Sequence, residues 1–87
     1  MIPAQCRAAR GLLNWDQGRI AVAAGVDIGI VHDFEEEKPV HRAMSDAIQR
    51  AFERAGVEFT NGGAPGVRLR PPPRAVRIND LNASNDE

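Results

Sequence analysis

Residues 17–34, QGRIAVAAGVDIGIVHDF, decide the fold of this chain. The stretch predicts a helix, a tight turn and a second helix. Asp16 precedes the first helix and Asp27 the second, and each offers a side-chain oxygen to the free backbone amides of a helix N-terminus. Gly25 lies between the two helices, where a turn of about three residues needs a backbone that tolerates positive φ. The two helices are therefore expected to meet at Gly25.

Small and branched apolar residues allow these two helices to cross closely. The residues expected to point into one shared core are Ile20, Val26, Val31 and Phe34. Counted from Gln17, the small residue Ala21, Gly25 and the branched Val31 fall at the fifth, ninth and fifteenth positions. This set resembles the helix-turn-helix of the XRE family, the phage-repressor-like DNA-binding domains.

The length of the chain, only 87 residues, limits it to one small domain. Its single cysteine, Cys6, rules out a disulfide within the chain. No apolar run is long enough to span a membrane or to act as a signal peptide, so we expect a cytoplasmic protein. A core with so few aromatic residues would gain stability from dimerisation.

Two further helices are expected beside the central pair. Residues 2–13 predict the first helix, with Pro3 in its first turn. Residues 39–56 contain an amphipathic helix with a wide apolar face. Its apolar positions are Met44, Ala47, Ile48, Ala51, Phe52 and Ala55. The chain is therefore expected to be mainly α, with four to five helices.

After the last helix the apolar residues alternate with polar ones. Residues 57–60 and 67–70 predict two strands joined by the turn NGGAP. A lone hairpin is marginal in water, so this one must pack on the last helix or pair with another chain. Residues 71–73 are three prolines and predict a stiff spacer. Residues 75–79 predict a short strand, which could be exchanged between two copies, and residues 80–87 a mobile polar tail.

The resemblance to small bacterial XRE-like regulators covers residues 2–70 and is strongest in PAQCRAARGLL and RAGVEF…PGVRLR, near its two ends. It implies a lambda-repressor-like helix-turn-helix domain over residues 1–56. A hairpin that is expected to dimerise follows in residues 57–70. A Pro-rich spacer with a polar tail follows in residues 71–87.

The resemblance also implies roles for single residues. Arg10 and Glu35 match a pair that forms a partly buried salt bridge between the first and third helices of the family. Members commonly have glycine after the third helix, where this sequence has Glu37. The third helix would lie in the major groove of DNA. The base-facing positions that match the family are Asp27, Ile28, Gly29 and Asp33, and His32 lies close to them.

These base-facing residues carry few groups that read bases. Ile28 can touch a thymine methyl group, and Asp33 can accept a hydrogen bond from a cytosine amino group. Gly29 reads no base directly. The residues expected to contact phosphates are Gln17 at the start of a helix, Arg42, and the flanking Lys38 and His41.

The charge distribution suggests a second function. The net charge is −1, whereas nucleic-acid binders usually show a basic surface. Residues 27–38 carry Lys38 against Asp27, Asp33, Glu35, Glu36 and Glu37, a net charge of −4. An acidic third helix could instead bind a protein, so that the chain acts as an adaptor or antiactivator.

Catalytic patterns are weak. His32 and Glu36 lie one helical turn apart and His41 follows, but a catalytic metal needs three ligands and a partner, and nothing else converges. The loop NGGAPG lacks the lysine and helix that follow a phosphate-binding loop. Cys6 lies on an apolar helix stripe and is expected to be a buried small hydrophobe. We expect no enzymatic activity, metal or cofactor.

The resemblance thus implies a homodimeric, sequence-specific transcriptional regulator, which we expect to repress by occupying a promoter. Two third helices would enter successive major grooves about 34 Å apart. Double-stranded DNA and a second copy are the expected partners, with another regulatory protein as the partner under the alternative. No membrane is expected to take part.

Overall fold

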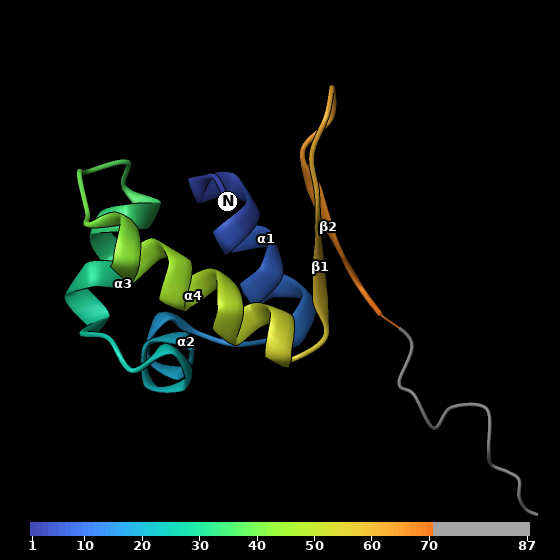
Figure 1. The fold of residues 1–87 in the computed structure, drawn as a ribbon. Helices are drawn as coiled ribbons and strands as arrows, with labels where there is room; N and C mark the ends of the chain where they lie inside the picture. Colours follow the sequence, from blue (N-terminus) through green and yellow to red (C-terminus); the bar gives the residue numbers. More distant parts are fainter. Residues whose placement is uncertain (71–87) are drawn as a thin grey trace, which may run out of the picture.

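The computed structural model of the chain describes residues 1–70, which form four helices followed by an antiparallel hairpin (Figure 1). The elements in chain order are α1 (Pro3–Leu13), α2 (Gln17–Ala24), α3 (Ile28–Glu35), α4 (Arg42–Arg54), β1 (Val57–Thr60) and β2 (Gly66–Leu69). This confirms the prediction of a mainly helical chain that ends in a hairpin. The predicted spacer, the strand at residues 75–79 and the polar tail lie outside the described residues.

The connection between α2 and α3 follows the sequence prediction. Asp16 Oδ1 accepts the backbone N–H of Arg19 at 2.8 Å, which confirms Asp16 as the cap of α2. Gly25 has a φ of 72°, and Val26 N–H closes the turn on the carbonyl of Ala21 at 3.0 Å. Glycine adopts this backbone conformation without the clash that a Cβ would bring.

The prediction that the Asp27 side chain caps α3 is wrong. Asp27 has the extended backbone of a cap residue, with φ −64° and ψ 143°, but its carboxylate makes no capping hydrogen bond. The Ile30 N–H, which such a carboxylate would take, donates to the Asp27 carbonyl at 2.9 Å. The backbone thus competes with the side chain for the same donor.

The core is built from apolar side chains of the four helices and β1. The fully or nearly fully buried ones are Cys6, Ala9, Ile20, Ala21, Val31, Ile48, Ala51, Phe52 and Val57. Val26 and Phe34 pack against this cluster as half-buried residues. The Trp15 ring stacks on Phe52 with centroids 6.2 Å apart, which ties the connection between α1 and α2 to α4.

The hairpin packs on its own chain. Val57 faces Leu69 and Phe59 faces Val67 in the register, and residues 61–65 form the predicted turn. The side chain of Gln5, on α1, donates from Nε2 to the carbonyls of Thr60 at 2.9 Å and Gly66 at 3.0 Å. Figure 1 shows the hairpin standing beside the helices, with its turn projecting past them.

Among the described residues, no helix has both the length and the apolar character needed to cross a membrane.

The exit of α3 places a glutamate in a conformation that suits glycine. Glu37 has a φ of 64°, while Lys38 N–H donates to the Asp33 carbonyl at 2.8 Å and Glu37 N–H to the Phe34 carbonyl at 3.1 Å. These two bonds form the helix-ending pattern that usually carries glycine at the left-handed position.

We expect Glu37→Gly to stabilise the fold by about 1 kcal/mol, because glycine removes the left-handed strain of a side chain. Glu36→Gly is the matched control, since it removes the same charge one residue earlier, where φ is −88°. The control should lower the free energy of unfolding by about 0.5–1 kcal/mol. Urea unfolding of both variants measures the difference, and equal effects would contradict the role of φ.

Candidate nucleic-acid interface

The N-terminal turns of α2 and α3 meet on one surface of the molecule. Ile28, the first residue of α3, is 54% exposed. Its Cδ1 lies over Gly18 in the first turn of α2, where an added Cβ would sit 3.7 Å from that atom. A Cβ at that place would make an ordinary van der Waals contact, so the Ile28 side chain lies beside the first turn of α2. The surface formed by Gln17, Gly18, Ile28 and Gly29 is termed the α2–α3 tip.

A buried carboxylate holds the helices that form this tip. Glu35, at the end of α3, is 5% exposed. Its Oε2 accepts from Arg10 Nε at 2.8 Å and its Oε1 from Arg10 Nη2 at 2.8 Å. This confirms the predicted salt bridge between α1 and α3. Gln17 Nε2 adds a third bond to Oε1 at 3.1 Å, and Cys6 Sγ a fourth to Oε2 at 3.1 Å.

The pKa values follow from this arrangement. Burial by itself raises the pKa of Glu35, but hydrogen bonds from Arg10, Cys6 and Gln17, with the charge of Arg10, lower it below its usual 4.5. Glu35 is therefore ionised at neutral pH. Burial, and then the hydrogen bond to Glu35, raise the pKa of Cys6 far above its usual range. Cys6 is thus a buried donor, and as a protonated thiol it is a poor nucleophile.

Gln17 is placed differently from the sequence expectation. It was expected to hold a phosphate with its side chain, yet one N–H of its amide already donates to Glu35. The amide carries two N–H donors, and the residue is half-buried at the start of α2. Glu35 thus fixes the orientation of Gln17, and only the second N–H can face a ligand.

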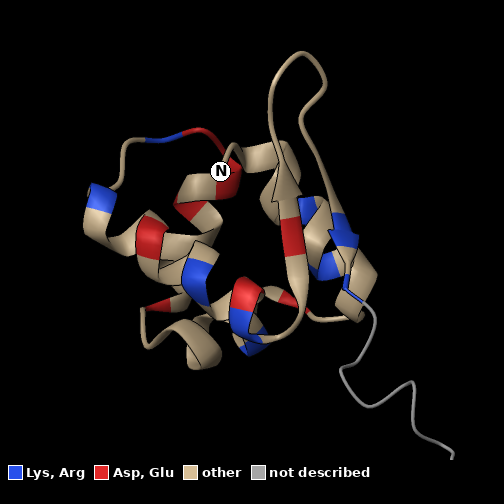
Figure 2. Cartoon of the chain, turned by 45° about the vertical axis from the view of Figure 1, so that its right-hand side comes forward, with Lys and Arg blue, Asp and Glu red and all other residues tan. Residues whose placement is uncertain are grey.

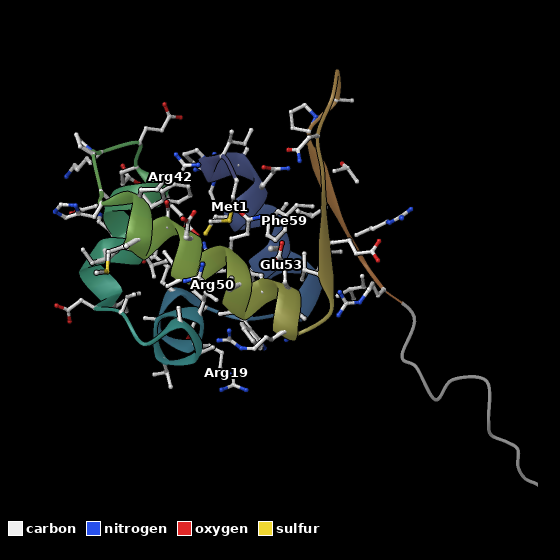
Figure 3. The ribbon with its side chains drawn as sticks, in the orientation of Figure 1. Met1, Arg19, Arg42, Arg50, Glu53 and Phe59 are labelled. Atoms are coloured by element: carbon white, nitrogen blue, oxygen red, sulfur yellow. The ribbon has the colours of Figure 1, made fainter. Side chains whose placement is uncertain are left out.

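The remaining predicted residues lie on α3 and on its connection to α4. Asp33 is half-buried, and the exposed ones are Asp27, Ile28, Gly29, His32, Lys38, His41 and Arg42. Arg42 extends from the N-terminal end of α4, and its side chain is 90% exposed (Figure 3). Its Nε lies 3.6 Å from Asp46 Oδ1. Such an exposed pair is weak, so Arg42 can exchange Asp46 for another anion.

An open groove lies between the turn that precedes α3 and the start of α4. Its volume is about 690 Å³. The lining residues are Gly25, Val26, Asp27, Ile30, Pro39, Val40, His41 and Met44. The groove brings Asp27 and His41 to one site, although they precede different helices in the sequence. We term it the α3–α4 groove.

Charge is divided unevenly over the surface. Figure 2 shows acidic positions gathered over α3 and its exit, while acidic and basic positions alternate along α4. Glu35 is neutralised inside the fold by Arg10, so its charge adds little to the field outside. The exposed acid of this region is therefore carried by Asp27, Glu36 and Glu37, with Asp33 half-buried.

Sequence reasoning missed the polar contacts of Gln5, Cys6 and Gln17. Gln5 directly precedes Cys6 on the apolar stripe of α1, and a polar residue at the edge of a buried stripe is the one signal that could have marked it. Nothing in the sequence connects Gln17 to Glu35. The stacking of Arg19 over Trp15, 4.8 Å from the ring centroid, was also not expected.

No protein-family model matches the chain, and no curated protein matches it.

Within residues 1–70, no three His, Cys, Asp or Glu side chains come close enough together to hold a metal ion.

We expect Glu35→Gln to lower the free energy of unfolding at pH 7 by about 2–4 kcal/mol, because Arg10 would lose its charged partner in a buried site. The pKa of Glu35 is lower in the folded than in the unfolded chain, so ionisation stabilises the fold above pH about 4.5. The parent loses this stability as the pH falls through the pKa of Glu35 in the folded chain. The gap in the free energy of unfolding between the parent and the variant should therefore narrow.

Urea unfolding at pH 7 and pH 3 measures this gap. Glu36→Gln is the control, since Glu36 is exposed next to Glu35, and it should lose little stability at either pH. A gap between parent and Glu35→Gln that is equal at both pH values would show that the charge of Glu35 does not stabilise the fold.

Proposed function

We propose that this chain is a sequence-specific DNA-binding transcriptional regulator with an XRE-like, lambda-repressor-like fold. The observation that carries the proposal is the α2–α3 unit, in which Gly25 at φ 72° joins two short helices and the first two residues of α3, Ile28 and Gly29, stay exposed. This geometry supports insertion of α3 into the major groove with its N-terminal residues toward the base edges.

Phosphate contacts would come from both neighbours of α3. The start of α2 offers free backbone amides and the second N–H of Gln17. The start of α4 offers Arg42, with Lys38 and His41 close to it in sequence. These groups would fix the position of α3 on the duplex, while the first residues of α3 would face the bases.

The acidic residues at the end of α3 are less opposed to DNA binding than the sequence suggests. Glu35 is paired with Arg10, while Glu36 and Glu37 follow the end of α3. A helix of eight residues is about 12 Å long, so these two lie a helix length away from Ile28. They would lie outside the major groove of the DNA, where their main effect is to lower non-specific attraction to phosphates.

We further propose that the regulator acts as a homodimer and represses transcription by occupying a promoter. The two α3 helices would enter successive major grooves about 34 Å apart on one face of the DNA. The hairpin is the proposed dimer element. Its turn projects past the helices in Figure 1, and Leu69 on β2 is exposed.

Arg42→Ala should weaken binding to all DNA sequences by a similar factor and reduce the slope of log K against log salt by about 0.9 per lost phosphate contact. Fluorescence anisotropy with labelled duplexes from the region upstream of the chain's own gene, at several salt concentrations, measures this slope. A scrambled duplex reports the sequence-independent part of the binding.

Arg50→Ala is the matched control, because Arg50 lies near the middle of α4, two turns beyond Arg42 (Figure 3). It should leave both affinity and slope close to those of the parent. If Arg42→Ala and Arg50→Ala behave alike, Arg42 makes no phosphate contact. If the upstream and scrambled duplexes bind the parent equally weakly, the proposal of a sequence-specific regulator fails.

The α3–α4 groove supports a second candidate, an adaptor or antiactivator that binds another regulatory protein. Its apolar lining of Val26, Ile30, Val40 and Met44 is open to solvent, and residues 27–38 beside it carry a net charge of −4. This combination suits a basic amphipathic helix, whose apolar face would fill the groove.

A synthetic amphipathic peptide of leucine and lysine should bind the groove, and its leucine and glutamate counterpart should not. Met44→Glu should weaken the lysine peptide about tenfold, because it places a charge among the apolar contacts. Val22→Glu adds the same charge at an exposed site on α2 and should change little. Calorimetry measures the binding, and equal effects of the two variants would rule out the groove as the site.

A further inference from the structure

The exposed face of α3 lacks the side chains that read purines. Arg and Lys read guanine by paired hydrogen bonds, and Asn and Gln read adenine in the same way. None of these four residue types occurs in residues 27–36. The exposed residues in the first turns of α3 are Ile28, Gly29 and His32. The turn that would enter the groove first is therefore apolar.

Ile28 lies where the first turns of α2 and α3 meet. Its Cδ1 lies 3.7 Å from the place that a Cβ on Gly18 would take, while 54% of the residue remains exposed. A branched side chain in a helix has few rotamers. The exposed methyl groups of Ile28 are thus limited to a few positions beside the start of α2.

Gly29, the next residue of α3, leaves open space at its own position. A Cβ built on Gly29 would meet no atom within 4 Å. A group of a ligand can therefore approach the α3 backbone at Gly29 and touch the side of Ile28. The site accepts a small apolar group and offers it no side-chain hydrogen bond from Ile28 or Gly29.

The thymine 5-methyl group is the apolar group that unmodified DNA presents in the major groove. From this match we infer that Ile28, which lies beside Gly18 and is followed by Gly29, reads thymine by its methyl group. The operator then carries a thymine opposite Ile28 in each half-site. This inference rests on the proposed DNA-binding function and names what its base-facing surface recognises.

The test begins with selection of duplexes from a random library by the full chain. In a selected duplex, each thymine is replaced singly by deoxyuridine, which removes only the methyl group. We expect one thymine in each half-site at which deoxyuridine weakens binding about threefold to fivefold, the worth of one buried methyl group. Other thymines should tolerate the replacement.

Ile28→Ala should abolish this sensitivity, because the methyl group would then have no apolar partner. Ile28 is exposed, so the variant should fold, and circular dichroism checks that it does. Val22→Ala is the matched control, since Val22 is a 76% exposed apolar residue on α2, and it should keep the sensitivity of the parent.

The possible results separate the inference from the proposed function. Selection of a defined sequence with no deoxyuridine-sensitive thymine would overturn the inference and leave the DNA-binding function intact. A sensitive thymine that stays sensitive in Ile28→Ala would also overturn it, since another residue would then make the contact. Failure to select any sequence would overturn the DNA-binding function and the inference together.

Discussion

The buried carboxylate of Glu35 is the interaction on which the rest of the fold depends. A charge in a buried site is unfavourable unless hydrogen bonds and an opposite charge compensate for it. Here the compensation comes from two other helices, because Arg10 and Cys6 belong to α1 and Gln17 to α2. The apolar core alone could tolerate small shifts of α3. The carboxylate cannot, since each shift would break directional bonds.

This constraint reaches the surface through Gln17. One bond from its amide to Glu35 sets the start of α2 against the end of α3, and Ile28 at the start of α3 lies beside Gly18 of α2. The α2–α3 tip is thus fixed by the polar contact of Gln17. A surface fixed in this way can discriminate between ligands by shape, even where it makes few hydrogen bonds.

Local signals predicted much of the fold from the sequence. Gly25, Asp16 and Ala21 act through neighbours within a few residues, and the alternation in residues 57–60 and 66–69 specifies a hairpin without reference to the helices. Long-range polar contacts were not predictable. The bonds from Gln5 to the hairpin span more than fifty residues, and nothing in the sequence near Gln5 marks its partners. The Asp27 prediction failed because two acceptors of one residue compete for the same N–H.

The acidic charge beside α3 bears on specificity more than on affinity. Non-specific binding to DNA comes almost entirely from phosphate neutralisation, so a chain of net charge −1 gains little from random sequences. Selection of a genomic site depends on the ratio of specific to non-specific binding, not on the specific affinity alone. For the proposed regulator, the carboxylates beyond the end of α3 lower the non-specific term, while Ile28 at the other end supplies contacts that do not depend on charge. A weakly basic surface is then compatible with sequence-specific recognition, provided that two copies combine their half-sites.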